Sequence, residues 1–173
     1  MWIYNALVPQ SRKMLKNLDQ CLSKAITYAE EKNFDAERLA VARLAPDHFS
    51  LSRHVQRACD AAKIGAARLA DVSAPEHTDG EAPLGDVRQR IGEVIAFLDG
   101  IEASQLKGAA EKEIALPFLK GKVLSGEDYL NEFVLPNLYF HITCAYAILR
   151  HNGVPLDKGD FIRPLSSRDP KGV

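Results

Sequence analysis

The 173-residue chain has no excess of charge of either sign, because 22 Lys and Arg stand against 23 Asp and Glu, a formal net charge of −1. This balance gives no electrostatic footprint for nucleic acid or for an anionic membrane surface. Nine Pro and 11 Gly are too few for a fibrous or low-complexity protein. With 46% hydrophobic residues, the length suits one domain with a single buried core.

Long hydrophobic runs are also missing. No stretch approaches the ~18 uninterrupted apolar residues that a membrane span needs. The longest apolar run, residues 133–149, is interrupted by Pro136, Asn137, His141 and Thr143. The first residues show no basic segment followed by an apolar one, so no signal peptide is visible.

Cysteine is scarce: Cys21, Cys59 and Cys144 are far apart and form no C-x-x-C pair. Each falls in a predicted helix, on or beside its apolar stripe, which is typical of small buried hydrophobic residues. We therefore expect a cytoplasmic protein.

What the sequence does contain is hydrophobic residues at helical spacing along almost its whole length. Asp35, Ser125 with Asp128, and Gly153 stand where helix caps are expected. The pattern predicts helices over residues 5–32, 36–43, 50–70, 84–98 and 125–152.

Between these helices the pattern changes. Residues 71–82 read as a polar loop, and segments 113–117 and 121–124 as short extended pieces that could form a hairpin. Pro136 should kink or divide the last helix. We expect an all-α four-helix bundle over residues 1–160, with an irregular or hairpin segment before its last helix and a tail over 161–173.

The last helix carries polar residues on its inward face. Phe133, Asn137, His141, Cys144 and Ile148 follow one another at steps of three or four and so share that face. Asn137 and His141 can converge on one point, which is how paired helices bind metals. A buried imidazole hydrogen-bonded to the amide explains the same spacing. The spacing alone leaves both interpretations open.

Four other histidines are weaker candidates. His54 flanks the apolar stripe of its helix and could face the same cavity as His141. His48 suits a solvated position at the helix entrance, His77 an exposed loop, and His151 the helix C-terminus, where an imidazolium favours the dipole.

The remaining chemical signals are slight. Asp60 and Lys63, three residues apart, read as a surface ion pair. Cys144 and His141 could form a thiol–imidazole pair, but no cation or helix N-terminus stands beside them. No G-x-S-x-G elbow or glycine-rich phosphate loop occurs.

Several segments together resemble an uncharacterised family of the DinB/YfiT-like superfamily. The resemblance runs from the first helix to about Phe161, and it is carried by residues 42–47, 55–63, 135–141 and 145–154 with Tyr129. It implies a four-helix bundle, commonly dimeric. Members of this superfamily often hold a divalent metal with one His from the second helix and an H-x3-H pair from the fourth. They include metal-dependent thiol transferases and a maleylpyruvate isomerase.

Carried over residue by residue, the resemblance implies a metal site at His54, Asn137 and His141. His141 matches the second His of the pair, Asn137 replaces the first, and His54 matches the helix-two ligand, with His48 as an alternative. Asn is a poorer ligand than His for Zn, Ni or Fe, because its amide oxygen is neutral and weakly basic.

Two hypotheses follow. In the first, the pocket binds a divalent metal that activates a thiol or water toward a small molecule, in a transferase or hydrolase, with Tyr139 or Tyr146 as proton donors at the edge. In the second, the chain is a non-catalytic, dimeric helical binding domain without metal. Both hypotheses expect a homodimer and neither involves nucleic acid or membrane. A shared ion requires His54 and His141 nitrogens within ~4–5 Å.

Overall fold

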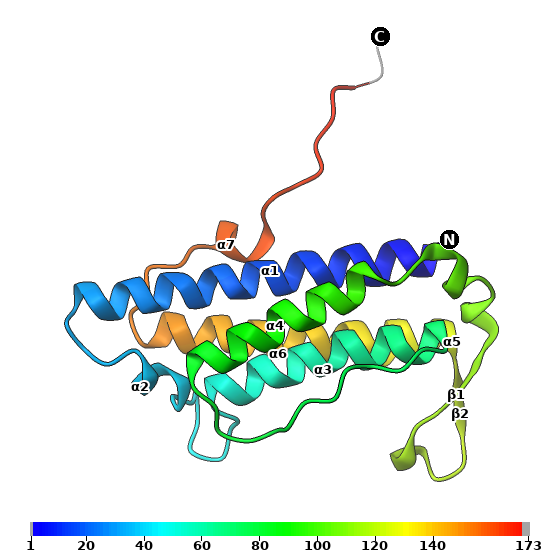
Figure 1. Ribbon diagram of the computed structural model, residues 1–173, viewed down its shortest axis with the longest axis horizontal. Coiled ribbons are helices and arrows are strands. Elements are labelled where there is room, and N and C mark those ends of the chain that lie inside the picture. Colours follow the sequence, from blue (N-terminus) through cyan, green and yellow to red (C-terminus); the bar gives the residue numbers. More distant parts are fainter. Residues whose placement is uncertain (1, 171–173) are drawn as a thin grey trace.

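Four long helices form the body of the protein (Figure 1), whose computed structural model describes residues 2–170. They are α1 (Trp2–Glu31), α3 (Leu51–Ala70), α4 (Leu84–Asp99) and α6 (Leu135–His151). The bounds of α1, α3 and α4 lie within a few residues of helices predicted from hydrophobic spacing, and α6 is the C-terminal part of the helix predicted over 125–152. The expected all-α four-helix bundle is therefore confirmed.

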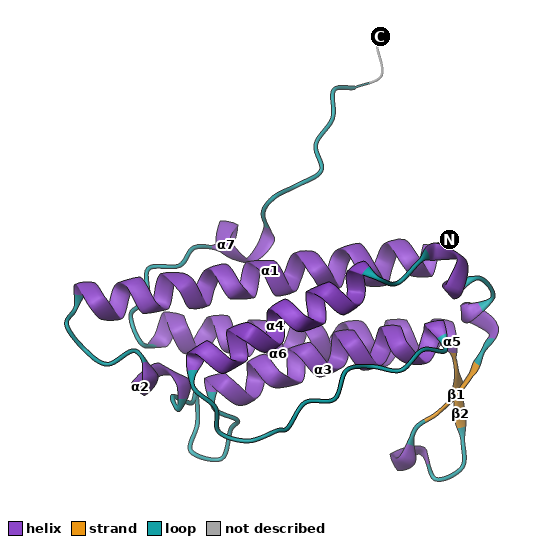
Figure 2. Ribbon diagram, viewed as in Figure 1, coloured by secondary structure: helices purple, strands orange, loops and turns teal. Residues whose placement is uncertain are grey.

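The connections contain short elements, coloured by type in Figure 2. The hairpin expected before the last helix is present: β1 and β2 pair antiparallel, with Ile114 opposite Leu124. The short elements are α2 (Glu37–Ala40), η1 (Ala103–Leu106), η2 (Ala109–Glu111), β1 (Glu113–Ala115), η3 (Pro117–Leu119), β2 (Val123–Ser125), α5 (Gly126–Asp128), η4 (Tyr129–Val134) and α7 (Lys158–Ile162).

The expected caps are confirmed where the last helix begins and ends. The hydroxyl of Ser125 accepts a hydrogen bond of 3.0 Å from the backbone N–H of Asp128. Gly153 follows α6 with φ of +89°, the left-handed conformation that ends many helices. These local signals fix where the last helical segment can start and stop.

The last helix is divided at its proline, as expected. Residues Tyr129–Val134 form a π-helix, η4, and α6 starts at Leu135 with Pro136 in its first turn. Proline fits there because the first turn of a helix needs no N–H from that residue. The wider turn of η4 precedes the residues that carry the candidate site.

Helix α3 lies at the centre and packs most extensively against α6. Its inward face carries Ala58, Ala62 and Ala66, all fully buried. A Cβ built on Gly65 would lie 2.5 Å from the Val134 side chain, so the glycine is what lets η4 approach this closely. Small side chains on α3 thus bring the second and last long helices near enough to share a site.

The short helix α7 lies against α1. The side chain of Asn17 donates a 2.8 Å hydrogen bond to the carbonyl of Phe161 in α7. Beyond α7, residues 163–170 are exposed and extend away from the bundle (Figure 1). The division into a domain over 1–160 and a tail over 161–173 stays a prediction, and residues 1 and 171–173 lie outside the described part.

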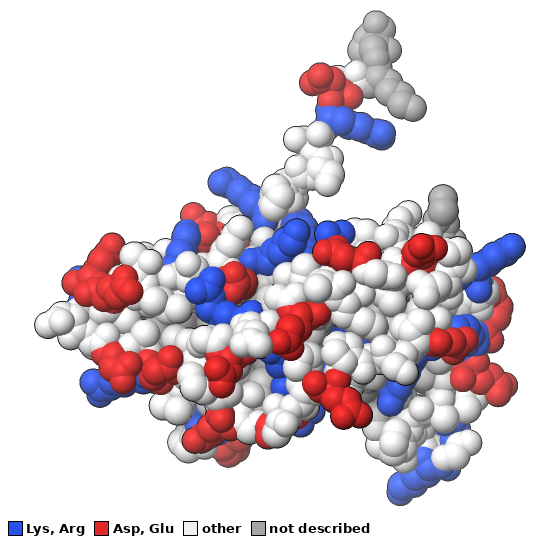
Figure 3. Space-filling model, viewed as in Figure 1, with Lys and Arg blue, Asp and Glu red and all other residues white. Residues whose placement is uncertain are grey.

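Charges on the visible face of Figure 3 are interspersed, with Lys and Arg beside Asp and Glu along the helices. Within residues 2–170, no helix is long and apolar enough to cross a membrane.

Candidate metal site and adjoining cavity

Three histidines meet between the start of α3 and the middle of α6. His54 lies in the first turn of α3 and is fully buried, and His141 of α6 is 9% exposed. His48 precedes α3 in the loop and is half-buried. The antiparallel packing of α3 and α6 brings the His54 and His141 side chains together from residues 87 apart in sequence.

His54 is the central member of this group, which we call the histidine cluster (His48, His54 and His141). Its Nδ1 lies 3.0 Å from Nδ1 of His141, and its Nε2 lies 3.1 Å from Nδ1 of His48. Two nitrogens about 2 Å from one ion are themselves about 3 Å apart, so each pair has the separation of two metal ligands. The spacing required for His54 and His141 to share an ion is met.

Aromatic rings cover the histidine cluster on its outer side. Phe140 packs edge-on to His54 and His141, and Phe49 stacks on His141 with ring centres 6.4 Å apart. Both phenylalanines keep about half their own surface exposed, 53% and 44%. They keep water from the imidazoles while leaving a large apolar surface at the mouth of the site.

This burial changes the acid–base state of the imidazoles. Desolvation is the main cause that lowers the pKa of His54 to about 4, and the neighbouring His141 and His48 add to it. The pKa of His141 is also lowered to about 4, by desolvation and then by the positive charge of Arg57. Both rings are therefore neutral at pH 7, which is the form that binds metals.

A thiol joins the cluster from the next turn of α6. Ligand atoms of His48, His54 and Cys144 lie within 4.8 Å of one another, so these three could also hold an ion. Burial raises the pKa of the Cys144 thiol, which disfavours the thiolate that binds metals. The sequence had placed Cys144 on the inward face but only as a partner of His141.

Asn137 lies one turn before His141. In a buried His–Asn pair its amide would bond to His141, but the structure gives it another partner. Its Nδ2 donates a 2.6 Å hydrogen bond to the carbonyl of Phe133. With His141 it lines a cavity of about 250 Å³ between α3, η3, η4 and α6. The structure thus brings all three expected site residues to one region, with His54 and His141 in contact and Asn137 on the cavity wall.

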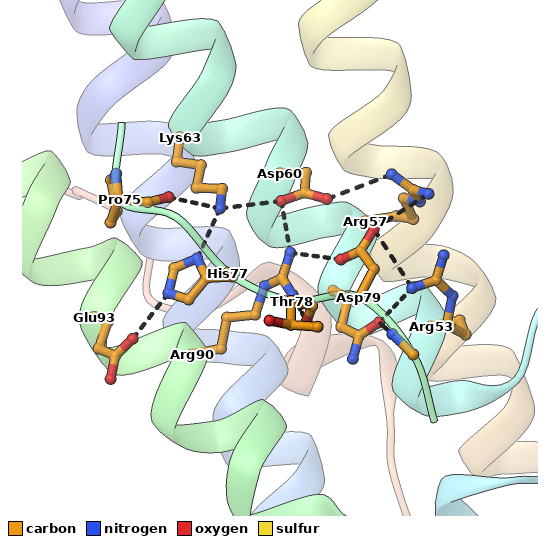
Figure 4. Close-up of polar contacts among 12 residues, drawn as sticks. Arg53, Arg57, Asp60, Lys63, Pro75, His77, Thr78, Asp79, Arg90 and Glu93 are labelled. Atoms are coloured by element: carbon orange, nitrogen blue, oxygen red, sulfur yellow. Dashed lines mark hydrogen bonds and ion pairs between the residues drawn. The ribbon is translucent and has the colours of Figure 1, made fainter. Parts of the chain in front are cut away.

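Charged residues of α3, α4 and the loop between them form a second cluster (Figure 4), which we call the loop-anchoring cluster (Arg53, Arg57, Asp60, Lys63, His77, Asp79, Arg90 and Glu93). Arg90 of α4 contacts Asp60 at 2.6 Å and Asp79 at 3.0 Å, and it donates to the carbonyl of Thr78. Lys63 donates to the carbonyl of Pro75 at 2.9 Å. These contacts fix the loop between α3 and α4 across the bundle.

Two sequence expectations are corrected here. Asp60 and Lys63 do contact each other, at 3.3 Å, but Lys63 is 4% exposed and the pair is not on the surface. His77 is not simply exposed, since its Nδ1 accepts from Lys63 and its Nε2 contacts Glu93 at 2.8 Å. Both errors have one cause: helical spacing cannot show that a loop covers the α3 face.

The expectation for His48 is also corrected. Its place at the helix entrance predicts a solvated side chain, whereas its ring lies against His54 with centres 4.6 Å apart. His48 precedes the helix, so no helical periodicity indicates which way its side chain points. The same holds for Phe49, the next residue.

The fold and the site together define a DinB-like helical bundle with a metal-compatible cluster of histidine and cysteine between its second and last long helices. Residues 3–162 match the family described as a domain of unknown function, DUF1993, and the chain belongs to that family. No curated protein matches the chain. The resemblance to an uncharacterised DinB-like family is therefore confirmed.

The chain is also similar to a solved structure, a DinB family member protein from Shewanella denitrificans. The two are 44% identical, the match covers 98% of this chain and 96% of the other, and the TM-score is 0.94.

Proposed function

We propose that the protein binds a divalent metal ion at His54, Asn137 and His141 and acts on a small molecule in the adjoining cavity, as a metal-dependent transferase or hydrolase. The observation that supports this most is the 3.0 Å separation of the His54 and His141 nitrogens, because His141 also lines that cavity. Both imidazoles are neutral at pH 7 because burial lowers the pKa of each to about 4.

The donor set fits a borderline metal such as Zn, Ni or Fe, for which imidazole is a good ligand. Such an ion, when bound, supplies a Lewis acid and lowers the pKa of a coordinated water or thiol. Asn137 is the weakest of the three ligands. Its Oδ1 makes no hydrogen bond to any of residues 2–170, whereas its Nδ2 is held by Phe133.

His54 cannot offer both ring nitrogens to one ion, so the alternative set of His48, His54 and Cys144 would be a separate site on its Nε2 side. Two facts favour the Nδ1 side. His141 and Asn137 line the cavity, where a small molecule can reach an open coordination position. On the Nε2 side the Cys144 thiol stays protonated, since burial raises its pKa.

Metal titration of chelator-treated protein tests this proposal. We expect one Zn, Ni or Fe(II) ion per chain by calorimetry and elemental analysis. His141→Ala should abolish this binding while circular dichroism shows an intact bundle. His151→Ala, which removes an exposed histidine from the same helix, is the matched control and should bind like the wild type.

The other outcomes decide between alternatives. Loss of binding in Cys144→Ser with retention in His141→Ala would move the ion to the Nε2 side of His54. No binding of any of the three metals would leave the second candidate, a non-catalytic helical binding domain. One observation favours that candidate: the three imidazoles already satisfy one another by hydrogen bonds.

We also propose a homodimer in a reducing compartment, the cytoplasm. The three cysteines are free thiols in the fold, and all three are buried, which agrees with that environment.

A further inference from the structure

We propose that the cavity beside His141 binds a small organic anion: a carboxylate attached to a single ring or an apolar group of similar size. This inference names the ligand class of the proposed function. It rests on that function in one respect, since His141 belongs to both the metal site and the cavity.

The size of the cavity limits the ligand. Its volume of about 250 Å³ exceeds the roughly 150 Å³ that holds benzene in an engineered protein cavity, and it lies just below the range of drug-sized pockets. One ring with a short substituent therefore fills the cavity.

The wall farthest from the histidines is aromatic. Phe133 lies between Phe118 and Tyr129, with ring centres 5.5 and 5.8 Å away. Phe118 is 59% exposed, so the apolar lining continues to the rim of the cavity. A planar apolar group entering here is buried against aromatic faces, which are favourable partners for another ring.

The cavity is lined by two guanidinium groups, those of Arg57 and Arg68, and by one carboxylate, that of Asp60. In the loop-anchoring cluster, the carboxylates of Asp60 and Asp79 are contacted by four cations, namely Arg53, Arg57, Lys63 and Arg90. Of these, Arg57 lines the cavity, and its two contacts are long, 3.5 Å to Asp60 and 3.3 Å to Asp79. The charge of Asp60 is compensated by Lys63 and Arg90 outside the cavity, so the two lining guanidinium groups make the field in the cavity favour an anion over a cation.

A second guanidinium on the wall has no carboxylate partner. Arg68 lies three turns after Arg57 on α3 and lines the same cavity. Within residues 2–170 it takes part in no ion pair. Its Nη1 donates a 3.3 Å hydrogen bond to the Tyr129 hydroxyl, and the guanidinium lies 5.8 Å from the centre of that ring. A guanidinium so held has donors left for a carboxylate.

The Tyr129 hydroxyl offers a further donor. Tyr129 is 1% exposed, and its oxygen accepts from Arg68. Burial raises the pKa of Tyr129, so the phenol keeps its proton. No acceptor for that proton lies within hydrogen-bonding distance among residues 2–170, and Tyr129 lines the cavity. A carboxylate between Arg68 and Tyr129 would supply the missing acceptor.

Binding of phenylacetate to the metal-free full-length protein tests the inference apart from the metal. We expect a dissociation constant of about 1 mM or tighter by NMR titration, with amide shifts around Tyr129, Phe133 and Ile64. Phenylacetamide, which has the same shape without the charge, should bind at least about tenfold more weakly. Acetate and inorganic phosphate, which lack the ring, should also bind at least about tenfold more weakly than phenylacetate.

Variants assign the binding to the arginine. Arg68→Gln should weaken phenylacetate binding about tenfold, the size of effect expected when one charged hydrogen bond is lost. Arg68→Lys should recover most of it. Arg38→Gln, the same change at an exposed arginine of α2 outside the cavity, is the matched control and should have no effect.

The two proposals can fail separately. If metal binds as expected but phenylacetate does not saturate by about 10 mM, or binds Arg68→Gln as well as wild type, the anion site is wrong and the metal site stands. Equal binding of phenylacetate and phenylacetamide also overturns it. If phenylacetate binds with the expected pattern and no metal binds, the anion site stands alone.

Discussion

His54 has an unusual position for a single side chain, since each of its two ring nitrogens faces another imidazole. A neutral imidazole carries one donor and one acceptor, so the three rings form a chain whose protons all point the same way. A metal on Nδ1 would need the lone pairs that this chain uses. Metal binding and the hydrogen-bond chain therefore compete at the same atoms, and binding at both Nδ1 atoms requires one of the two neutral rings to move its proton to Nε2.

Acid should destabilise the metal-free protein through the same residues. The pKa of His54 and that of His141 lie near 4 in the folded chain against 6.5 as the ordinary value. The unfolded chain thus binds more protons, so this stability is complete above pH 6.5 and is lost as the pH falls toward 4. The loss is at most about 1.4 kcal/mol per pH unit for each histidine.

Urea unfolding at pH 7, 6 and 5 after chelator treatment measures this loss. His141→Asn should reduce the dependence of the unfolding free energy on pH by up to about 1.4 kcal/mol per pH unit, which corresponds to one proton. His151→Asn is the surface control. A stability that stays constant from pH 7 to 5 in the wild type would contradict the lowered pKa values.

At the scale of elements, the contact between α3 and η4 depends on the absence of one methyl group. In Gly65→Ala the new Cβ would meet Val134 at 2.5 Å, too close without a shift of one helix. We expect a loss of about 1–3 kcal/mol in unfolding free energy, the usual cost of overpacking.

Gly92→Ala is the matched control on α4. A Cβ there meets nothing within 4 Å, so the substitution should stabilise the protein by up to about 1 kcal/mol through helix propensity. Chemical denaturation of the two variants should give opposite signs. Equal effects would mean that Gly65 does not limit the approach of η4.

The loop between α3 and α4 depends on Arg90. Arg90→Met would leave Asp60 and Asp79 without their closest cation, and we expect a loss of about 2–4 kcal/mol, typical of breaking a buried ion pair from one side. Arg88→Met, two residues earlier on the same helix, removes a pair with Asp19 that is about one-third exposed. It should cost less than about 1 kcal/mol.

Limited proteolysis gives an independent measure of the same loop. Glu-C cleavage at Glu76 or Glu81 should become faster in Arg90→Met and stay unchanged in Arg88→Met. Faster cleavage in both variants would point to global unfolding, and no change in either would show that other contacts hold the loop.

At the scale of the whole molecule, the oligomeric state stays a prediction from the superfamily resemblance. Large apolar side chains on the surface, including Phe49, Phe140 and Phe118, are available to be covered. Light scattering after size exclusion should give about twice the 19.1 kDa chain mass. A monomer at concentrations near 100 μM would contradict the dimer.

The arrangement of the bundle could be predicted from the sequence, because the apolar stripe of a long amphipathic helix shows which face is buried. The limits of α3 and α4 agree with the spacing of apolar residues to within one residue, and the hairpin follows from the two short apolar segments before Ser125. Pro136 indicates a division of the last helix, although nothing in its spacing predicts the wider turn of η4.

The same reasoning predicts only part of the candidate site. His54 and His141 lie on helices whose inward faces are known, so their meeting could be expected. His48 and the covering loop over Lys63 lie outside any periodic segment, and their positions depend on tertiary contacts such as the one between Arg90 and Asp60. Helical spacing gives no information about residues of that kind.

The π-helix η4 joins the aromatic wall of the cavity to the part of α6 that carries His141. Tyr129 and Phe133 stand before its end and His141 after it, on one continuous helical rod. Deleting a single residue from η4 would rotate the preceding turn of this rod, with Tyr129, by about 100° relative to α6 and His141. A change of length at η4 would thus turn the aromatic wall of the cavity relative to His141 without altering the α3–α6 contact that holds the histidine cluster, so the wall and the cluster can vary independently.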